Sequence, residues 1–286
     1  MIRFLKHHEI DKQKWDDAIG DSSAKSVYAL SWYLDCVSNN WCALIEDDYI
    51  SVMPLPVKPK WGITLITQPI LCQQLGIFFT EKSLIKDLTV WLTSIPVTFP
   101  LIRLCLNGEN AKDKSIKGKP RNNYLLDLSN NYDTISGLYS NDCKRNIAKA
   151  RNKAIITKTI TIDEAFAFFK QNESIFDNQQ MRTIFDTIKS QNLLSISAAS
   201  HHETLISVSF FVKSFTSYIY LASCTNNHGR KSAANYLLID LFIREHCNSK
   251  SILDFEGSTI DSIAKFFAGF GATKIEFLQV KRWNIF

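Results

Sequence analysis

The chain has 286 residues, of which 45% are hydrophobic and 12% aromatic, and its net charge at pH 7 is +5. Only 10 residues are glycine and 7 are proline, a composition that excludes an extensively disordered or low-complexity protein. The length suits two domains of about 100–150 residues each. Because the positive charges are spread along the chain, they permit an anionic ligand without requiring nucleic acid.

The 7 cysteines form no CxxC pair and have no spacing with histidine that suits zinc, so we expect reduced thiols and no metal site. No apolar run reaches the ~18 residues that cross a bilayer. Residues 1–4 are typical of a strand rather than an export signal. We therefore expect a cytoplasmic protein without a membrane span.

Hydrophobic periodicity and turn residues divide the first half into alternating elements. Strands are predicted at residues 2–5, 42–45, 50–57, 101–106 and 124–128, and helices at residues 11–19, 28–37, 80–92 and 133–150. Thr80 is the predicted cap of the third helix. The fourth helix ends in a basic cluster of Lys144, Arg145, Lys149, Arg151 and Lys153. We place the domain boundary there, which gives domains 1–150 and 151–286.

The second half repeats the order of the first. Strands are predicted at residues 155–160, 194–199, 204–212, 218–222, 252–255 and 274–280, and helices at residues 162–171, 178–191, 232–247 and 261–270. The order is β-α-α-β-β-β-α-β-α-β, and the first half opens with β-α-α-β-β. We therefore predict an α/β (α+β) protein of two tandem units, each with a mixed central sheet flanked by helices.

A polar loop precedes the helix predicted at residues 232–247. Backbone N–H groups at a helix start lack partners within the helix, so this loop combines free donors, flexible backbone and positive charge. The predicted phosphate-binding residues are Asn226, Asn227, Gly229, Arg230, Lys231 and Ser232. The alternative interpretation is an ordinary capped helix start.

Two carboxylates follow the apolar run at residues 252–253, in the sequence Asp254-Phe255-Glu256-Gly257. They stand at the carboxyl end of a predicted strand, where ligands bind in open α/β sheets. We expect only one of the two carboxylates to face a cleft. The alternative for either is a structural role, such as capping the next helix or pairing with Arg230.

The order of elements resembles the GNAT acyltransferase fold, and two such units in tandem resemble FemABX-type peptidyltransferases and BioF2-like acetyltransferase-domain proteins. Four segments carry the resemblance: the basic helix at residues 141–150, the loop at residues 224–234, the D-F-x-G match at residues 254–257, and the match to F-K-x-x-F-G at residues 266–271. It implies a bacterial acyltransferase with a degenerate first unit. The donor would be acyl-CoA (acetyl-CoA), and an amine acceptor would bind between the two domains.

The last of these segments departs from the family pattern. In the tRNA-dependent transferases its second residue is a lysine that meets phosphate and the forming oxyanion, and here it is Phe267. A preorganised oxyanion donor is often worth ~3 kcal/mol. Lys265, two positions earlier, points to the opposite side of the helix and does not replace it. The loop also has one glycine where the family has two or three.

The resemblance assigns roles to several side chains. Asp254 is favoured over Glu256 as base because the family keeps an acid there, and Tyr220 or Tyr236 is the candidate acid for the leaving thiol. The alternative for both tyrosines is the core. Arg145, Lys149 and Phe267 are the candidate acceptor-binding residues, the basic helix being otherwise a solvated face. His201 and His202 occupy a predicted hairpin turn, and exposed turn residues are the expected interpretation.

Three alternatives stay open at this level. The chain is a tRNA-dependent aminoacyl (peptidyl) transferase acting on a cell-wall precursor, a catalytically lapsed GNAT pair that binds a ligand or partner, or a nucleic-acid-binding module that uses the basic helix.

Overall fold

A computed structural model describes residues 1–60, 62–153, 155–172 and 179–283. The chain divides into two compact units, unit 1 with residues 1–122 and 276–286 and unit 2 with residues 123–275. The boundary expected at residue 150 differs from this division. The basic helix belongs to unit 2, because it packs on another helix of that unit, and the last strand returns to unit 1.

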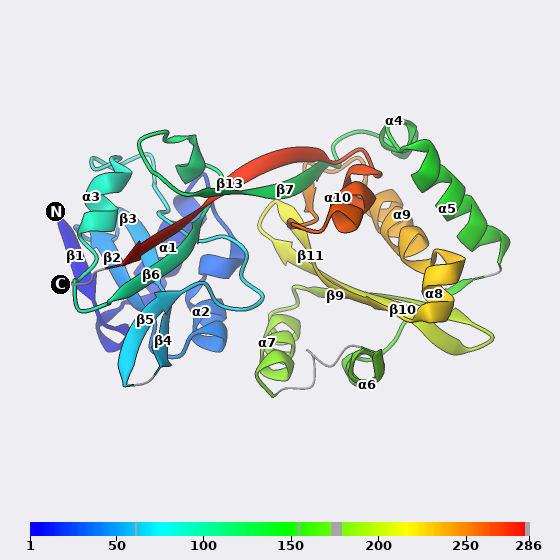
Figure 1. Cartoon of the computed structure of the whole chain (residues 1–286), viewed down its shortest axis with the longest axis horizontal. Coiled ribbons are helices and arrows are strands. Elements are labelled where there is room, and N and C mark those ends of the chain that lie inside the picture. The colour runs from blue at the N-terminus through cyan, green and yellow to red at the C-terminus, as the bar shows by residue number, and fades with distance from the viewer. Residues whose placement is uncertain (61, 154, 173–178, 284–286) are drawn as a thin grey trace. The chain divides into compact units, whose positions relative to one another are not determined.

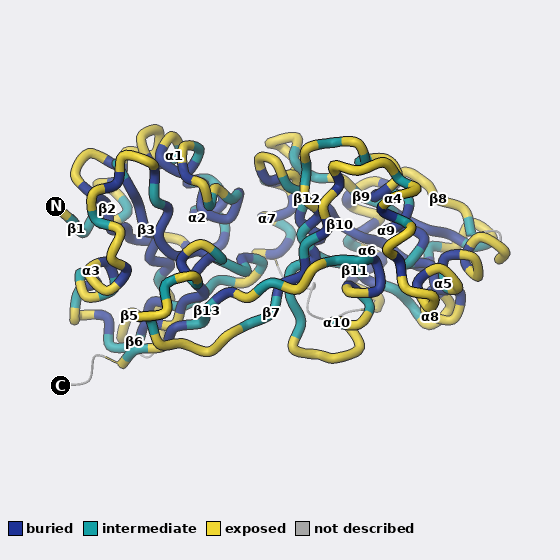
Figure 2. Tube along the Cα trace, turned by 90° about the horizontal axis from the view of Figure 1, so that it is seen from above, coloured by how far each residue is buried: buried dark blue, intermediate teal, exposed yellow. Residues whose placement is uncertain are grey.

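Unit 1 contains two sheets. Its elements are β1 (Ile2–Leu5), α1 (Lys12–Asp21), α2 (Ser31–Val37), β2 (Cys42–Glu46), β3 (Ser51–Leu55), β4 (Val57–Lys60), β5 (Ile63–Thr67), α3 (Leu88–Thr93) and β6 (Leu101–Leu106), with short 3-10 turns at His7–Glu9, Val27–Ala29 and Asn110–Lys112. The strands β1-β2-β3 form one sheet, and β4-β5-β6 continues into β13 (Thr273–Trp283). Strands β2 and β3 are buried throughout (Figure 2).

The prediction of a helix at residues 80–92 is wrong over its first half. Helix α3 begins only at Leu88, and Asp87 caps it. The cause is the carboxylate of Glu46, a fully buried residue of β2. It accepts hydrogen bonds from the Leu84 N–H at 2.9 Å, the Ile85 N–H at 3.1 Å and the Ser83 hydroxyl at 2.7 Å. Backbone groups bound to a distant carboxylate are not available to a helix.

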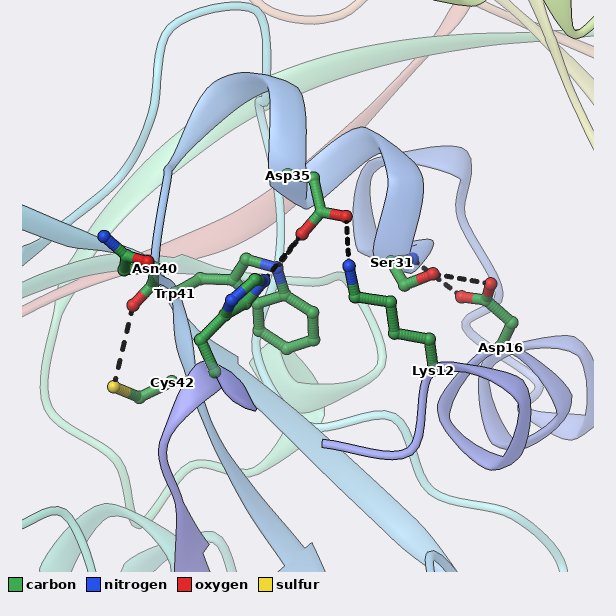
Figure 3. A network of polar contacts seen from close by, with 8 residues as sticks. Lys12, Asp16, Ser31, Asp35, Asn40, Trp41 and Cys42 are labelled. Carbon is green, nitrogen blue, oxygen red and sulfur yellow. Dashed lines mark hydrogen bonds and ion pairs between the residues drawn. The ribbon is translucent and has the colours of Figure 1, made fainter. Parts of the chain in front are cut away.

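A polar cluster anchors the start of unit 1 (Figure 3). Asp35 of α2 accepts from Lys12 Nζ at 2.6 Å and from Trp41 Nε1 at 3.0 Å, and it contacts His7 Nε2 at 2.8 Å. The bonds from Lys12, His7 and Trp41 lower the pKa of Asp35 against the opposing effect of burial, which raises it. The cluster joins three segments that are separate in sequence.

Unit 2 is built on six strands of the ten-stranded sheet, with helices on both faces (Figure 1). Its elements are β7 (Lys119–Asp127), α4 (Tyr132–Gly137), α5 (Asn141–Asn152), β8 (Ile156–Lys158), α6 (Ile162–Asn172), α7 (Gln179–Ser190), β9 (Leu194–His201), β10 (Thr204–Ser214), β11 (Ser217–Thr225), α8 (Asn227–Ser232), α9 (Ala234–His246), β12 (Ile252–Asp254) and α10 (Asp261–Ala268). The strand order is β7-β12-β11-β10-β9-β8. The start predicted for α7, residue 178, lies outside the described residues.

Alternation along β10 explains how both faces of the unit 2 sheet are covered. Successive side chains of a strand point to opposite faces. Phe210 packs with Phe169 of α6 and Phe185 of α7, at ring distances of 5.1 and 4.4 Å. Phe211 stacks on Phe242 of α9 at 3.7 Å on the other face. The predicted α/β architecture of mixed sheets flanked by helices is confirmed.

Candidate active site

Strands β11 and β12 part where β12 ends. They pair in parallel at Ser217, Tyr218 and Ile219, the last opposite Asp254. From Tyr220 to Thr225, β11 pairs with β10 alone among the described strands. The chain after Asp254 stays with β7, because the Phe255 N–H donates to the Tyr124 carbonyl at 3.0 Å. One edge of β11 is therefore left without a strand partner beside Asp254.

A bulge lies at the start of this unpaired edge. Opposite β10, Tyr220 pairs with Phe211 and Ala222 pairs with Phe210, so Leu221 is an extra residue in β11. Bulges bend a strand and re-aim the side chains that follow, and they are frequent beside active sites. Ala222 and Ser223, which follow the bulge, are half-buried. The unpaired edge is thus partly accessible.

Asp254 combines burial with the absence of a cation. Burial raises the pKa of its carboxyl to about 6, although hydrogen bonds from the Glu256 N–H and the Asn123 side chain oppose the rise. The bond from the Glu256 N–H is 2.7 Å long, and Asn123 is buried. Asp254 forms no ion pair within the described part of the chain. A carboxyl in this state is ionised at pH 7 yet able to accept a proton.

Glu256 differs from Asp254 because it lies beyond the strand. Side chains two positions apart in a regular strand share a face, so strand alternation does not separate these carboxylates. Instead, Glu256 has a φ of 58°, in the left-handed region, and the chain turns there. Its carbonyl accepts from the Tyr124 N–H at 3.2 Å. Glu256 therefore takes part in a turn that holds the residues after Asp254 against β7.

Tyr220 lies on the other face of the sheet, packed beneath α9. Its hydroxyl accepts from Asn235 Nδ2 at 2.7 Å, and Asn235 Oδ1 accepts from the Ser209 hydroxyl at 2.9 Å. Burial raises the pKa of Tyr220, against hydrogen bonds with Ser223, Asn235 and Ser209. Because Ile219 is the register partner of Asp254, Tyr220 and Asp254 point to opposite faces. The phenol is fixed and stays protonated at neutral pH.

The predicted phosphate loop is a short helix, α8, and most of its polar groups are already bound. Asn226 caps α8, its side chain accepting from the Gly229 N–H at 2.9 Å. The Ser232 hydroxyl donates to the His228 carbonyl at 2.8 Å within the same turn. A Cβ added at Gly229 would lie 2.2 Å from the Ile206 carbonyl oxygen, so this glycine allows α8 to pack on β10.

The remaining residues of α8 are accessible. Asn227, Arg230 and Lys231 are exposed. Ala233 then adopts a φ of 59° and ends α8, and α9 begins at once without a side-chain cap. The helix predicted at residues 232–247 therefore starts two residues later than expected. Arg230 and Lys231 form no ion pair in the contacts of the described residues. They are therefore the members of the predicted set whose charge is free to bind a ligand.

The basic helix α5 uses its cations in different ways. Arg145 is exposed and pairs with Asp142 at 2.8 Å. Arg151 pairs at 2.7 Å with Asp240 of α9, a fully buried carboxylate that also accepts from the Tyr132 hydroxyl at 2.7 Å. Lys149 is exposed. The structure thus assigns Arg151 to packing between α5 and α9 and leaves Arg145 and Lys149 on the surface.

Phe267 belongs to the core of unit 2. It is 6% exposed, stacks on Phe255 at 5.1 Å, and contacts the ring of Tyr220 at 6.1 Å. It offers little surface to a substrate. The glycine of the same motif, Gly271, has a φ of 79°, and a Cβ there would lie 2.7 Å from the Cβ of Leu138. Both residues are explained by packing, while Lys265 is exposed.

Sequence reasoning missed a cluster of three histidines. His201 ends β9, His202 follows it in the turn, and His228 lies on α8. The ring of His201 is 4.1 Å from that of His202 and 4.7 Å from that of His228. The turn and α8 are distant in sequence, so spacing gave no signal for this contact.

The described residues also bear on metal binding and on membrane insertion. No group of three or more His, Cys, Asp or Glu side chains among them is arranged to hold a metal ion. None of the helices they form has the length and hydrophobicity needed to span a membrane.

Comparison with known proteins gives a consistent fold. No family model and no curated protein matches the chain. The crystal structure of FemX superposes with a TM-score of 0.68 at 13% identity, over 95% of this chain and 96% of that one. A tandem GNAT protein from the clavulanic acid biosynthesis pathway superposes with a TM-score of 0.62 at 10% sequence identity, over 100% of this chain and 99% of that one. A conserved protein from Bacteroides thetaiotaomicron superposes with a TM-score of 0.62 at 11% sequence identity, over 99% of this chain and 100% of that one. The chain therefore has the tandem GNAT fold and is similar to FemX.

Proposed function

We propose that the chain is an N-acyltransferase that moves an acyl or aminoacyl group from a coenzyme A thioester to an amine. The observation that carries the proposal is the edge of β11 beside Asp254, where the described residues provide neither a strand partner for β11 nor an ion pair for the carboxyl, whose pKa is raised. Perturbed carboxylates next to an open binding edge are candidates for proton transfer.

The unpaired edge suits an extended donor. Strand edges present free N–H and C=O groups, which bind an added extended chain through main-chain hydrogen bonds. The pantetheine arm of coenzyme A is extended and contains two amides, so it is a chemical match for residues 220–225. Arg230 and Lys231 are exposed cations on α8, directly after this strand, and supply charge for the phosphates of the donor.

The two proton-transfer groups follow from this placement. As the amine nitrogen attacks the thioester carbonyl, the C–N bond forms and the nitrogen loses a proton, which Asp254 accepts. The C–S bond then breaks, and the thiolate takes a proton from the Tyr220 hydroxyl. An arm held between the ends of β11 and β12 has Asp254 and Tyr220 on its two sides, because they lie on opposite faces of the sheet.

The acceptor side of the proposal rests on charge. Phe267 is buried where tRNA-dependent relatives carry a lysine, which favours a coenzyme A donor over aminoacyl-tRNA. Arg145 and Lys149 are exposed on α5 and suit an amine acceptor that carries an anionic group.

Thermal unfolding with acetyl-CoA tests the proposal. We expect millimolar acetyl-CoA to raise the Tm, because a ligand that binds only the folded state stabilises it. The double variant Arg230→Ala, Lys231→Ala is expected to weaken binding by about 3- to 10-fold, as for two exposed charge contacts. Lys213→Ala with Lys250→Ala, two exposed lysines elsewhere in unit 2, is the matched control. No shift at millimolar acetyl-CoA contradicts the proposal, and salt-sensitive tRNA binding would favour tRNA-dependent transfer.

A further inference from the structure

The three histidines at the β9–β10 turn lie beside a lysine, and the described residues provide no ion pair to them. The charges that act on His201 come from His202 in the turn, His228 on α8 and Lys153 after α5. Glu203 follows His202 in the turn but forms no ion pair with these rings in the described contacts. His202, His228 and Lys153 are exposed, and His201 is half-buried.

Such a cluster is unfavourable when it is protonated and empty. The three imidazolium rings, 4.1 and 4.7 Å from one another, repel when all are protonated, and Lys153 adds a fourth like charge. Burial, together with these neighbours, lowers the pKa of His201. An anion placed among the rings would reverse the balance, since each protonated imidazole offers two N–H donors and a lysine offers three.

We propose that His201, His202, His228 and Lys153 form a binding site for a phosphate group, which is filled when the imidazoles are protonated. Phosphate is the ligand class because the site offers several N–H donors and at least three positive charges, and an oxyanion with three or four acceptor oxygens satisfies them. This inference deepens the proposed function and rests on it in one respect: His228 shares α8 with Arg230 and Lys231, so the ligand would be the 3′-phosphate of the donor.

Two sources of phosphate fit the same chemistry, namely coenzyme A and free inorganic phosphate. They are distinguished by comparing coenzyme A with dephospho-coenzyme A, which lacks only the 3′-phosphate. In either case binding takes up protons, so affinity decreases as the pH rises above the pKa of the free histidines. We expect the preference for coenzyme A over dephospho-coenzyme A to be about 10-fold larger at pH 6 than at pH 8, equivalent to one proton taken up over one pH unit.

Proton NMR of the histidine rings provides the direct test. Titration with inorganic phosphate at pH 6, and separately with coenzyme A, is expected to shift the ring signals of His201 and His228, while those of His246, whose ring is stacked on Phe242, do not move. Signals are assigned with single His→Gln variants. The triple variant His201→Gln, His202→Gln, His228→Gln should lose the pH-dependent preference for coenzyme A, and His8→Gln, an exposed histidine of unit 1, should keep it.

The outcomes separate this inference from the proposed function. If inorganic phosphate shifts the ring signals but coenzyme A does not bind, the phosphate site stands and the proposed function fails. If coenzyme A binds at pH 8 and neither phosphate nor coenzyme A moves the histidine signals at pH 6, the phosphate site is contradicted and the proposed function stands. A preference for coenzyme A that persists unchanged in the triple variant also overturns the inference.

Discussion

Asp240 and Asp254 are two carboxylates of unit 2 with opposite surroundings. Asp240 is fully buried in α9 and receives Arg151 and the Tyr132 hydroxyl, each at 2.7 Å. Asp254 is half-buried at the end of β12 and receives one backbone N–H and one amide. The two carboxylates therefore differ in the charge of their partners, because a cation binds Asp240 whereas the donors to Asp254 are neutral.

The physical reason is that the two carboxylates differ in how readily they bind a proton. A carboxylate paired with a guanidinium keeps its negative charge, because protonation would sacrifice a strong charge-assisted hydrogen bond. A carboxylate that is desolvated without a cation binds a proton more readily, as the raised pKa of Asp254 shows. Asp240 is thus suited to join α5 to α9, and Asp254 is suited to exchange protons.

Removing the cation of Asp240 gives the largest expected effect. Arg151→Ala leaves the fully buried carboxylate of Asp240 without its cation, and we expect the free energy of unfolding to decrease by about 3 kcal/mol. Chemical denaturation at pH 7 measures the change. Arg145→Ala on the same helix is the matched control, since its exposed pair with Asp142 is worth at most about 1 kcal/mol. Equal effects of the two variants would contradict the comparison.

Removing the carboxylate of Asp254 comes second. Asp254→Asn keeps the shape of the side chain but cannot accept the proton of the attacking amine, and we expect kcat/KM for acyl transfer to decrease at least ~10²-fold. Thiol release from acetyl-CoA with a panel of amines measures the rate. Asp127→Asn, an exposed aspartate of the neighbouring strand β7, should retain the wild-type rate. A variant at position 254 that is as active as wild type would mean that this carboxylate is not the base.

The pH dependence of stability should show a smaller effect with a defined sign. The pKa of Asp254 is raised in the folded state to about 6 from an ordinary value of 3.8. Between these values the folded chain binds more protons than the unfolded chain, so this group makes stability decrease as the pH rises from about 4 to 6. We expect the free energy of unfolding to decrease by about 1–2 kcal/mol over this range because of Asp254, after allowance for its partial exposure. In Asp254→Asn that part of the dependence should be absent, which urea denaturation at pH 4.5 and 7 would reveal.

Much of the fold was readable from the sequence. In α7 the buried residues Met181, Ile184, Phe185 and Ile188 recur at helical spacing, and the order of strands and helices in unit 2 follows the predicted one. The exceptions arise from contacts distant in sequence. Glu46 binds the Ser83 hydroxyl and the backbone N–H groups of Leu84 and Ile85, where a helix was expected, and no local pattern contains that information.

The candidate site was readable only in part. The sequence placed Asp254 at a strand end, but the unpaired edge of β11 depends on where β12 stops, and the role of Gly229 depends on the nearby Ile206 carbonyl. The sequence does contain a signal for the structural role of Asp240, although no motif includes it. It is an aspartate within the apolar helical run at residues 237–243, where a charge requires a partner.

The path of the chain between the two units affects the order of folding. Unit 2 is continuous in sequence, whereas unit 1 is completed by residues 276–286. Strand β6 finds its antiparallel partner in β13, with Leu106 opposite Leu278 and Leu101 opposite Trp283. During synthesis, unit 2 therefore has its whole sequence available before unit 1 does. Until β13 emerges from the ribosome, the edge of β6 that pairs with it stays open, and an open strand edge is a site for intermolecular pairing.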